Sequence, residues 1–298
     1  MHYIPGWLEE HWPDLNEEMG AEVKFNGLNP GIAFHVEAKP IDSVACIDDS
    51  RKIHLWENYL QLLWCTCYAQ QALYEAWQRS VRAGRPAGRY DSTDPAVRTA
   101  FDVLDAGVGL LDLFDPRQFE GLPMPLNPDG EQDELVAKAN ILFVAATGFI
   151  ILHEYAHHLF EHVAIISGEE ESKKHEVAAD DFALSFLRRG EGRGRDVDNI
   201  NALGVLATMT TLMLMEPSLE GGPAHPDIHE RLLNALERLN LSGAGEIWVS
   251  GCICLQTWGR YYPVPVVVRD PAIARDPQDM FRDILGQIVR HQHPKYRL

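Results

Sequence analysis

The sequence is poor in basic residues. Lysine and arginine together number 26 against 44 aspartates and glutamates, so the 298-residue chain has a formal net charge of -18 at pH 7. A protein that binds nucleic acid neutralises phosphates with a basic surface. The sequence has no basic cluster beyond Arg188–Arg189 and Arg193–Arg195. We therefore expect no nucleic-acid partner.

Long apolar segments are also missing. No uninterrupted apolar run approaches the roughly 18 residues of a transmembrane helix. Residues 1–7, MHYIPGW, show neither the basic nor the apolar segment of a secretory signal. We therefore expect a cytoplasmic protein without a membrane span.

Cysteines are few and odd in number. The five cysteines include two C-x-C pairs, whose spacing is too tight for the knuckles of a zinc ribbon. They are Cys46, Cys65, Cys67, Cys252 and Cys254. Because a cytoplasmic protein keeps its thiols reduced, we interpret all five as reduced core residues.

The remaining composition is that of a globular protein, with 46% hydrophobic and 23% charged residues. Period-two alternation predicts short strands over residues 22–25, 32–36, 44–47 and 52–55, the last two forming a hairpin around residues 48–51. Apolar residues at helical intervals predict helices over residues 56–81, 92–113, 134–163, 172–188, 200–215, 227–239, 246–258 and 279–289.

The predicted fold class is therefore α+β and mainly α-helical. We expect one domain over residues 1–298, with a β-rich part at 1–55, a helical core at 56–240 and a helical C-terminal part at 241–298. The segment at 115–134 is rich in proline and glycine, and it is interpreted either as a surface loop or as a lid.

One motif carries chemistry. His153 and His157 flank Glu154 in an H-E-x-x-H pattern, which follows the uncharged run Ala139–Leu152. On a helix, residues i and i+4 share a face, so both imidazoles can bind one cation while Glu154 serves as a base. Placing such polar side chains in a buried helix is costly unless something binds them. The motif therefore predicts a metal site, with one Zn2+ per chain.

A catalytic zinc site usually has three protein ligands and one open position. Glu176, 19 residues after His157, is the expected third ligand, on a helix that returns antiparallel. Asp180 lies one turn later and is expected to accept the free N–H of a ligand histidine. His175 is an alternative ligand, but it points roughly 100° away from Glu176 around a helix.

Other histidines near the motif are expected to play lesser roles. The extended pattern H-E-x-x-H-x-x-G-x-x-H is absent, because Phe160 and Val163 occupy its glycine and third histidine positions. We interpret His158 and His162 as surface residues or as supports of the ligands.

A third segment, Ala224–Leu232, contains His225 and Arg231. Either residue is a candidate for stabilising the oxyanion of a hydrolytic reaction. The alternative for Arg231 is that it holds Asp180 in place.

The order H-E-Y-A-H, E-V-A-A-D and H-P-D-I-H-E-R-L resembles that of gluzincin metallopeptidases of the CAAX-protease and HtpX type. From residue 56 to Arg231 the chain is more similar to the family of the phage-exclusion peptidase Lit. The resemblance implies a zincin-like core of the minigluzincin type. It also implies a cytosolic zinc endopeptidase that stays latent until a phage-derived peptide activates it, and whose substrate is the host elongation factor Tu.

The residues themselves favour hydrolysis of peptide bonds, with zinc on His153, His157 and Glu176 and with Glu154 as the base. One alternative is a regulatory metalloprotease resembling the ImmA type, which cleaves a repressor. Another is a metal-stabilised interaction protein without catalysis, but a purely structural site needs no base such as Glu154 and is usually closed by a fourth ligand.

Overall fold

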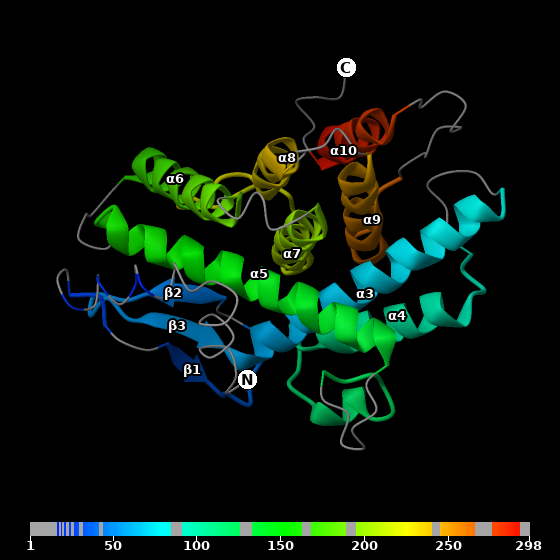
Figure 1. Cartoon of the computed structure of the whole chain (residues 1–298), viewed down its shortest axis with the longest axis horizontal. Helices are drawn as coiled ribbons and strands as arrows, with labels where there is room; N and C mark the ends of the chain where they lie inside the picture. Colours follow the sequence, from blue (N-terminus) through cyan, green and yellow to red (C-terminus); the bar gives the residue numbers. More distant parts are fainter. Residues whose placement is uncertain are drawn as a thin grey trace.

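The computed structural model is mainly helical, with one small sheet, so the predicted fold class is confirmed (Figure 1). It describes residues 17, 19, 21, 24, 27–29, 32–41, 44–84, 91–125, 133–162, 168–188, 195–239, 245–265 and 276–292. In chain order the elements are β1 (Ala33–His35), β2 (Ala45–Ile47), β3 (Ile53–Trp56), α3 (Glu57–Arg82), α4 (Pro95–Gly109), η1 (Pro116–Phe119), α5 (Glu134–Leu159), α6 (Glu169–Arg188), α7 (Arg195–Leu214), α8 (Ile228–Leu239), α9 (Glu246–Tyr261) and α10 (Pro277–Gln292).

The sheet has the strand order β1-β3-β2, in which β1 runs parallel and β2 antiparallel to β3. This confirms the hairpin, whose turn is closed by the Asp48 carboxylate accepting the backbone N–H of Lys52 at 3.0 Å. Strand β2 lies at an edge of the sheet. Of the strand predicted at residues 22–25, only Lys24 is described, and it is helical; the strand prediction is wrong at that residue.

Helix α5 is the centre of the fold. Asp133 caps its start by accepting the Leu135 N–H at 2.7 Å. The helix ends at Leu159, and Glu161 adopts a left-handed backbone with φ 57°, so the expected continuation toward residue 163 is not formed. Figure 1 shows the sheet on one side of the C-terminal half of α5 and α6 on the other.

The same helix is long and apolar enough, by length and composition, to cross a membrane. Its most apolar window has a mean hydropathy of 2.1, but 61% of that window is buried inside the protein. The buried core helix of a soluble protein meets the same criterion of length and composition, so α5 is only weak evidence for a membrane span. The expectation concerned uninterrupted apolar runs, and the run in α5 ends at Leu152, before His153 and Glu154.

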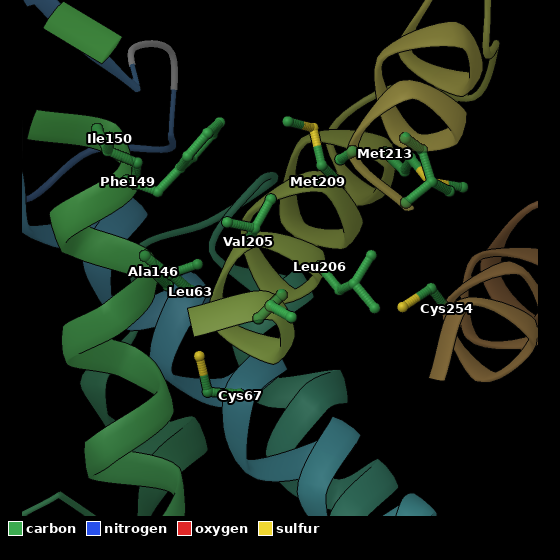
Figure 2. Close-up of a cluster of buried hydrophobic side chains, with 14 of the residues drawn as sticks. Leu63, Cys67, Ala146, Phe149, Ile150, Val205, Leu206, Met209, Met213 and Cys254 are labelled. Carbon is green, nitrogen blue, oxygen red and sulfur yellow. The ribbon is translucent and has the colours of Figure 1, made fainter. Parts of the chain in front are cut away.

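The core lies where α7 crosses α5 and packs against α3 and α9. Figure 2 shows Phe149 of α5 facing the side of α7 that carries Val205 and Met209. The two helices approach closely because Gly204 has no side chain: a Cβ there would lie 2.6 Å from the Cβ of Ala145. This packing fixes the segment of α5 just before the H-E-x-x-H motif.

Four cysteines, Cys65, Cys67, Cys252 and Cys254, are buried as predicted, and all five are free thiols. Cys46 is exposed, so its interpretation as a core residue was wrong. It lies on the edge strand β2, in which successive side chains point to opposite faces of the sheet, and the side chain of Cys46 points to solvent. The segment at 115–134 contains the short η1, and residues 126–132 lie outside the described part of the chain.

Candidate functional site

The three predicted ligands meet at the C-terminal end of α5. His153 and His157 come from its last two turns, and Glu176 lies two turns into α6. The Nε2 atoms of the two histidines are 3.2 Å apart. The Glu176 carboxylate oxygens lie 3.5 Å from Nε2 of His153 and 3.3 Å from Nε2 of His157.

These distances suit a metal ion. Bonds of about 2.0–2.1 Å at tetrahedral angles place neighbouring ligand atoms about 3.3 Å apart. The three side chains are buried or half-buried, and their ligand atoms form a group that can hold a cation. The donor set of two imidazoles and one carboxylate therefore fits a metal with one open coordination position.

Helix α6 brings Glu176 to the motif because one of its faces is apolar. Ala179, Ala183 and Leu184 of that face are buried, whereas Val177 is 42% exposed on the other. Burial opposes the charged form of Glu176, but hydrogen bonds from His153, His157 and His225 hold the pKa of its carboxyl well below the usual range. Glu176 is therefore a carboxylate at neutral pH.

Asp180 lies one turn after Glu176 and contacts the first ligand histidine. Its Oδ1 is 2.9 Å from Nδ1 of His153, the contact that was predicted. Arg231 of α8 donates to both Asp180 oxygens, from Nε at 2.7 Å and from one Nη at 2.8 Å. Burial raises the pKa of Asp180, but Arg231 and His153 outweigh it and lower that pKa to about 2.

The same carboxylate acts on His153. Burial disfavours the imidazolium, yet the hydrogen bonds to Asp180 and Glu176 raise the pKa of His153 to about 10 in the metal-free site. A metal ion bound there would have to displace a proton from His153, so metal binding would weaken as the pH falls.

Glu154 faces the cavity beside the two histidines. It is 8% exposed, and burial, more than any neighbouring charge, raises the pKa of its carboxyl. The backbone N–H of Ile47, on the edge strand β2, donates to this carboxylate. A carboxylate with a raised pKa that is not one of the three grouped ligands is suited to proton transfer.

His225 and Arg231 both reach Glu176. Nδ1 of His225 lies 3.1 Å from a Glu176 oxygen, and the His225 side chain is 61% exposed. Arg231 is 3.8 Å from the same oxygen and holds Asp180, which is the alternative role considered for it. Of the two, His225 is the more open to an incoming substrate.

The loop before α8 that carries His225 has its own internal contacts. Asp227 accepts the backbone N–H of Gly221 at 2.7 Å, and His229 lies 3.2 Å from the carbonyl oxygen of Leu219. Asp227, His229 and Glu230 also form a group of metal-ligand types, but the first two side chains are used to hold the loop.

The site opens into a cavity of about 540 Å³. Sequence reasoning missed most of its wall, including Tyr59 and Met215. No short-range pattern separates such residues from packing residues, because the cavity is made by elements distant in sequence. The remaining wall consists of Val44, Ala45, Phe149, Ile150, Thr208, Leu212, Glu216, Ser218, Glu220, Gly221, Gly222, Pro226 and Ile228.

Two further histidines pack beside the ligands. Nδ1 of His162 is 3.0 Å from Nδ1 of His157, and the rings of His162 and His175 stack at 3.8 Å. His175 is absent from the ligand group. His158 is buried against Tyr155, so its interpretation as a surface residue was wrong.

Comparison with known proteins gives a family match. A profile of the family described as peptidase U49 matches residues 53–250, about two-thirds of the chain. No curated protein and no solved structure matches. The matched region begins with β3, ends within α9 and includes His153, Glu154, His157, Glu176, Asp180, His225 and Arg231, whereas Val44, Ala45 and Ile47 of the β2 region precede it. The chain therefore belongs to the peptidase U49 family and is a hydrolase of peptide bonds.

Proposed function

We propose that this peptidase is a zinc-dependent endopeptidase. The observation that carries the proposal is the spacing of 3.2–3.5 Å among the ligand atoms of His153, His157 and Glu176. Two imidazoles and a carboxylate with one open position are typical of catalytic zinc. Zinc held there would supply Lewis acidity to the attack of water on a peptide carbonyl.

The side chains around the ligands then have distinct roles. Glu154 removes a proton from the attacking water as the new carbon–oxygen bond forms. It passes that proton to the amine nitrogen when the carbon–nitrogen bond breaks. His225, exposed at the cavity, is placed to donate a hydrogen bond to the developing oxyanion. Asp180, fixed by Arg231, orients His153.

The edge strand β2 is suited to hold a substrate in an extended conformation. The backbone N–H of Asp48 bonds to the carbonyl oxygen of Lys52, so the alternating antiparallel pattern points the peptide groups of Ala45 and Ile47 away from β3. Ala45 lines the cavity and Ile47 donates to Glu154. An extended peptide that pairs with this edge passes directly beside the ligands.

The test compares two substitutions in the purified full chain. Glu154→Gln should keep about one zinc per chain and lose peptidase activity by at least about 100-fold, because it removes a general base and leaves the ligands. Glu176→Ala should lose both zinc and activity. Zinc content is measured by elemental analysis, and activity by mass spectrometry of a peptide library. Wild-type activity in the Glu154→Gln variant would exclude the proposed mechanism.

The biological role that we propose is latent defence against phage in the cytoplasm. It rests on the likeness of the three motifs to those of the Lit family, and it names elongation factor Tu as the substrate and a phage-derived peptide as the activator. Expressed alone, the protein should be tolerated and should cut casein poorly. Co-expressed with the activator, it should arrest translation unless it carries Glu154→Gln.

The same experiment tests the substrate. A proteomic search for newly formed N-termini after co-expression should find a cut in elongation factor Tu. Vigorous unassisted cleavage of many unrelated proteins would contradict latency, and a cut confined to a repressor would identify a regulatory peptidase instead.

A further inference from the structure

The two ligand histidines have different partners on the side away from the metal position. Nδ1 of His153 meets the carboxylate of Asp180 at 2.9 Å, whereas Nδ1 of His157 meets Nδ1 of His162 at 3.0 Å. The first partner carries a negative charge that Arg231 compensates. The second partner is another imidazole.

His162 is held in place by its surroundings. The left-handed backbone of Glu161, with φ 57°, turns the chain just after α5 and brings His162 back beside His157. The ring of His162 stacks on that of His175 at 3.8 Å, with an angle of 9° between the planes. Phe160 contacts it as well, with ring centroids 5.5 Å apart. The imidazole is therefore fixed between α5 and α6.

The chemistry of this contact is determined by the ligand role of His157. When Nε2 of His157 gives its lone pair to a metal ion, its proton must be on Nδ1. That N–H then needs an acceptor, and at 3.0 Å the acceptor is Nδ1 of His162. His162 must have a free lone pair on that nitrogen, so its own proton is on Nε2.

We propose that His162 is a positioning residue, which fixes the tautomer and ring orientation of His157 for metal binding. This inference rests on the proposed function, because it presupposes a metal at His153, His157 and Glu176. It goes beyond that function in assigning a fourth histidine to the site. It also gives the stacked pair of His162 and His175 a purpose other than packing.

The test uses two substitutions that separate hydrogen bonding from packing. Asparagine places its Oδ1 where histidine has Nδ1, so His162→Asn keeps an acceptor. Leucine fills much of the same space without one, so His162→Leu removes it. Zinc affinity of the full chain is measured by competition with a chelating dye. Because partners of this kind typically change metal affinity 10–100-fold, His162→Leu should weaken zinc binding by about that factor, and His162→Asn by only a few-fold.

Two controls complete the experiment. His291→Ala removes an exposed histidine of α10, and it should leave the zinc affinity unchanged. The thermal midpoints of the metal-free His162→Leu and His162→Asn variants show whether either substitution perturbs packing. Equal zinc affinities for wild type and His162→Leu would overturn the positioning role while leaving the metal site intact. A wild-type chain that binds no zinc would instead overturn the proposed function.

Discussion

At the scale of single residues, the site contains a buried ion pair between Asp180 and Arg231. Both side chains are at least 89% buried, with side-chain exposures of 4% and 11%. The planar guanidinium meets both carboxylate oxygens, a geometry that lysine cannot reproduce. The pair therefore allows a buried charge to remain next to His153.

Removing one partner of the pair should be more harmful than removing both. Arg231→Leu leaves the Asp180 charge buried, and we expect a loss of about 3–5 kcal/mol in the free energy of unfolding. The double variant Asp180→Asn, Arg231→Leu carries no uncompensated charge and should recover part of that loss. Urea unfolding of the metal-free proteins measures both effects. The Asp180→Asn single variant completes the comparison. If the loss of unfolding free energy in the double variant equals the sum of the losses in the two single variants, the two residues are not coupled.

Asp94, at the start of α4, is a second residue whose charge contributes to the stability of the fold. It accepts the Ala96 N–H and the Arg79 guanidinium, each at 2.9 Å, and the hydrogen bond from Arg79 is the main cause of its lowered pKa. A carboxyl whose pKa is lower in the folded state stabilises the protein above its unfolded value of about 3.9. That contribution is lost as the pH falls through the folded value.

The Asp94→Asn variant should expose this dependence. Asparagine is also a good N-cap, so at pH 7 the variant should lose only the charge component, up to about 1 kcal/mol. The difference in unfolding free energy from wild type should shrink as the pH is lowered below about 4. Urea unfolding at pH 7, 5 and 3.5 measures this difference. If the difference in unfolding free energy stays constant from pH 7 to pH 3.5, Asp94 keeps an ordinary pKa in the folded protein.

At the scale of elements, the crossing of α5 and α7 determines where the motif lies. A methyl group on Gly204 would meet Ala145 at 2.6 Å and the backbone nitrogen of Ala146 at 2.8 Å. Neither atom can move without shifting α5. The helices can cross this closely because residue 204 is glycine.

Gly204→Ala should therefore destabilise the protein by about 1–3 kcal/mol, although alanine is favoured over glycine in a helix by about 1 kcal/mol. Gly259 of α9 is the matched control, because a Cβ there has no atom within 4 Å. Gly259→Ala should be neutral or stabilising by up to about 1 kcal/mol. Thermal midpoints compare the two, and equal midpoints would mean that the α5–α7 crossing can relax.

The elements were largely predictable from the sequence, and so was the centre of the site. The H-E-x-x-H spacing placed two ligands on one helix face, and the apolar face of α6 brought Glu176 and Asp180 to them. These contacts depend on helical periodicity, which is visible in a sequence. For His162 the sequence left two roles open, a surface residue or a support of the ligands, because its contact with His157 depends on the left-handed turn at Glu161.

The rest of the site depends on contacts between distant segments. Tyr59 lines the cavity with a fully buried side chain, yet in the sequence it is one more aromatic residue of an amphipathic helix. The exposure of Cys46 depends on β2 lying at an edge of the sheet. Neither strand order nor cavity walls have a local signature.

At the scale of the whole molecule, the chemical reactivity of the five cysteine thiols indicates whether the fold has opened. Cys65 and Cys67 lie on α3, and Cys252 and Cys254 on α9; all four are buried. Burial raises the pKa of Cys65 and of Cys254 to about 12. Cys46 is exposed, although partial burial and the Glu154 charge raise the pKa of its thiol too.

Native protein at pH 8 should therefore react with a thiol reagent at one site per chain. Thiol reactivity requires both access and the thiolate form, and among the five cysteines Cys46 alone is exposed. All five should react in denaturant, and Cys46→Ser should abolish the native reaction. Two or more thiols reacting rapidly in the native protein would contradict the burial of α3 or α9.

The distances along the chain between site residues also have a consequence for synthesis. His153 and Asp180 are 27 residues apart, whereas Arg231 follows Asp180 by another 51. Because a chain emerges from the ribosome N-terminus first, α5 and α6 become available to each other before α8 has been made. The three side chains proposed as metal ligands can thus come together early, but Asp180 gains its cationic partner only when most of the chain has been translated.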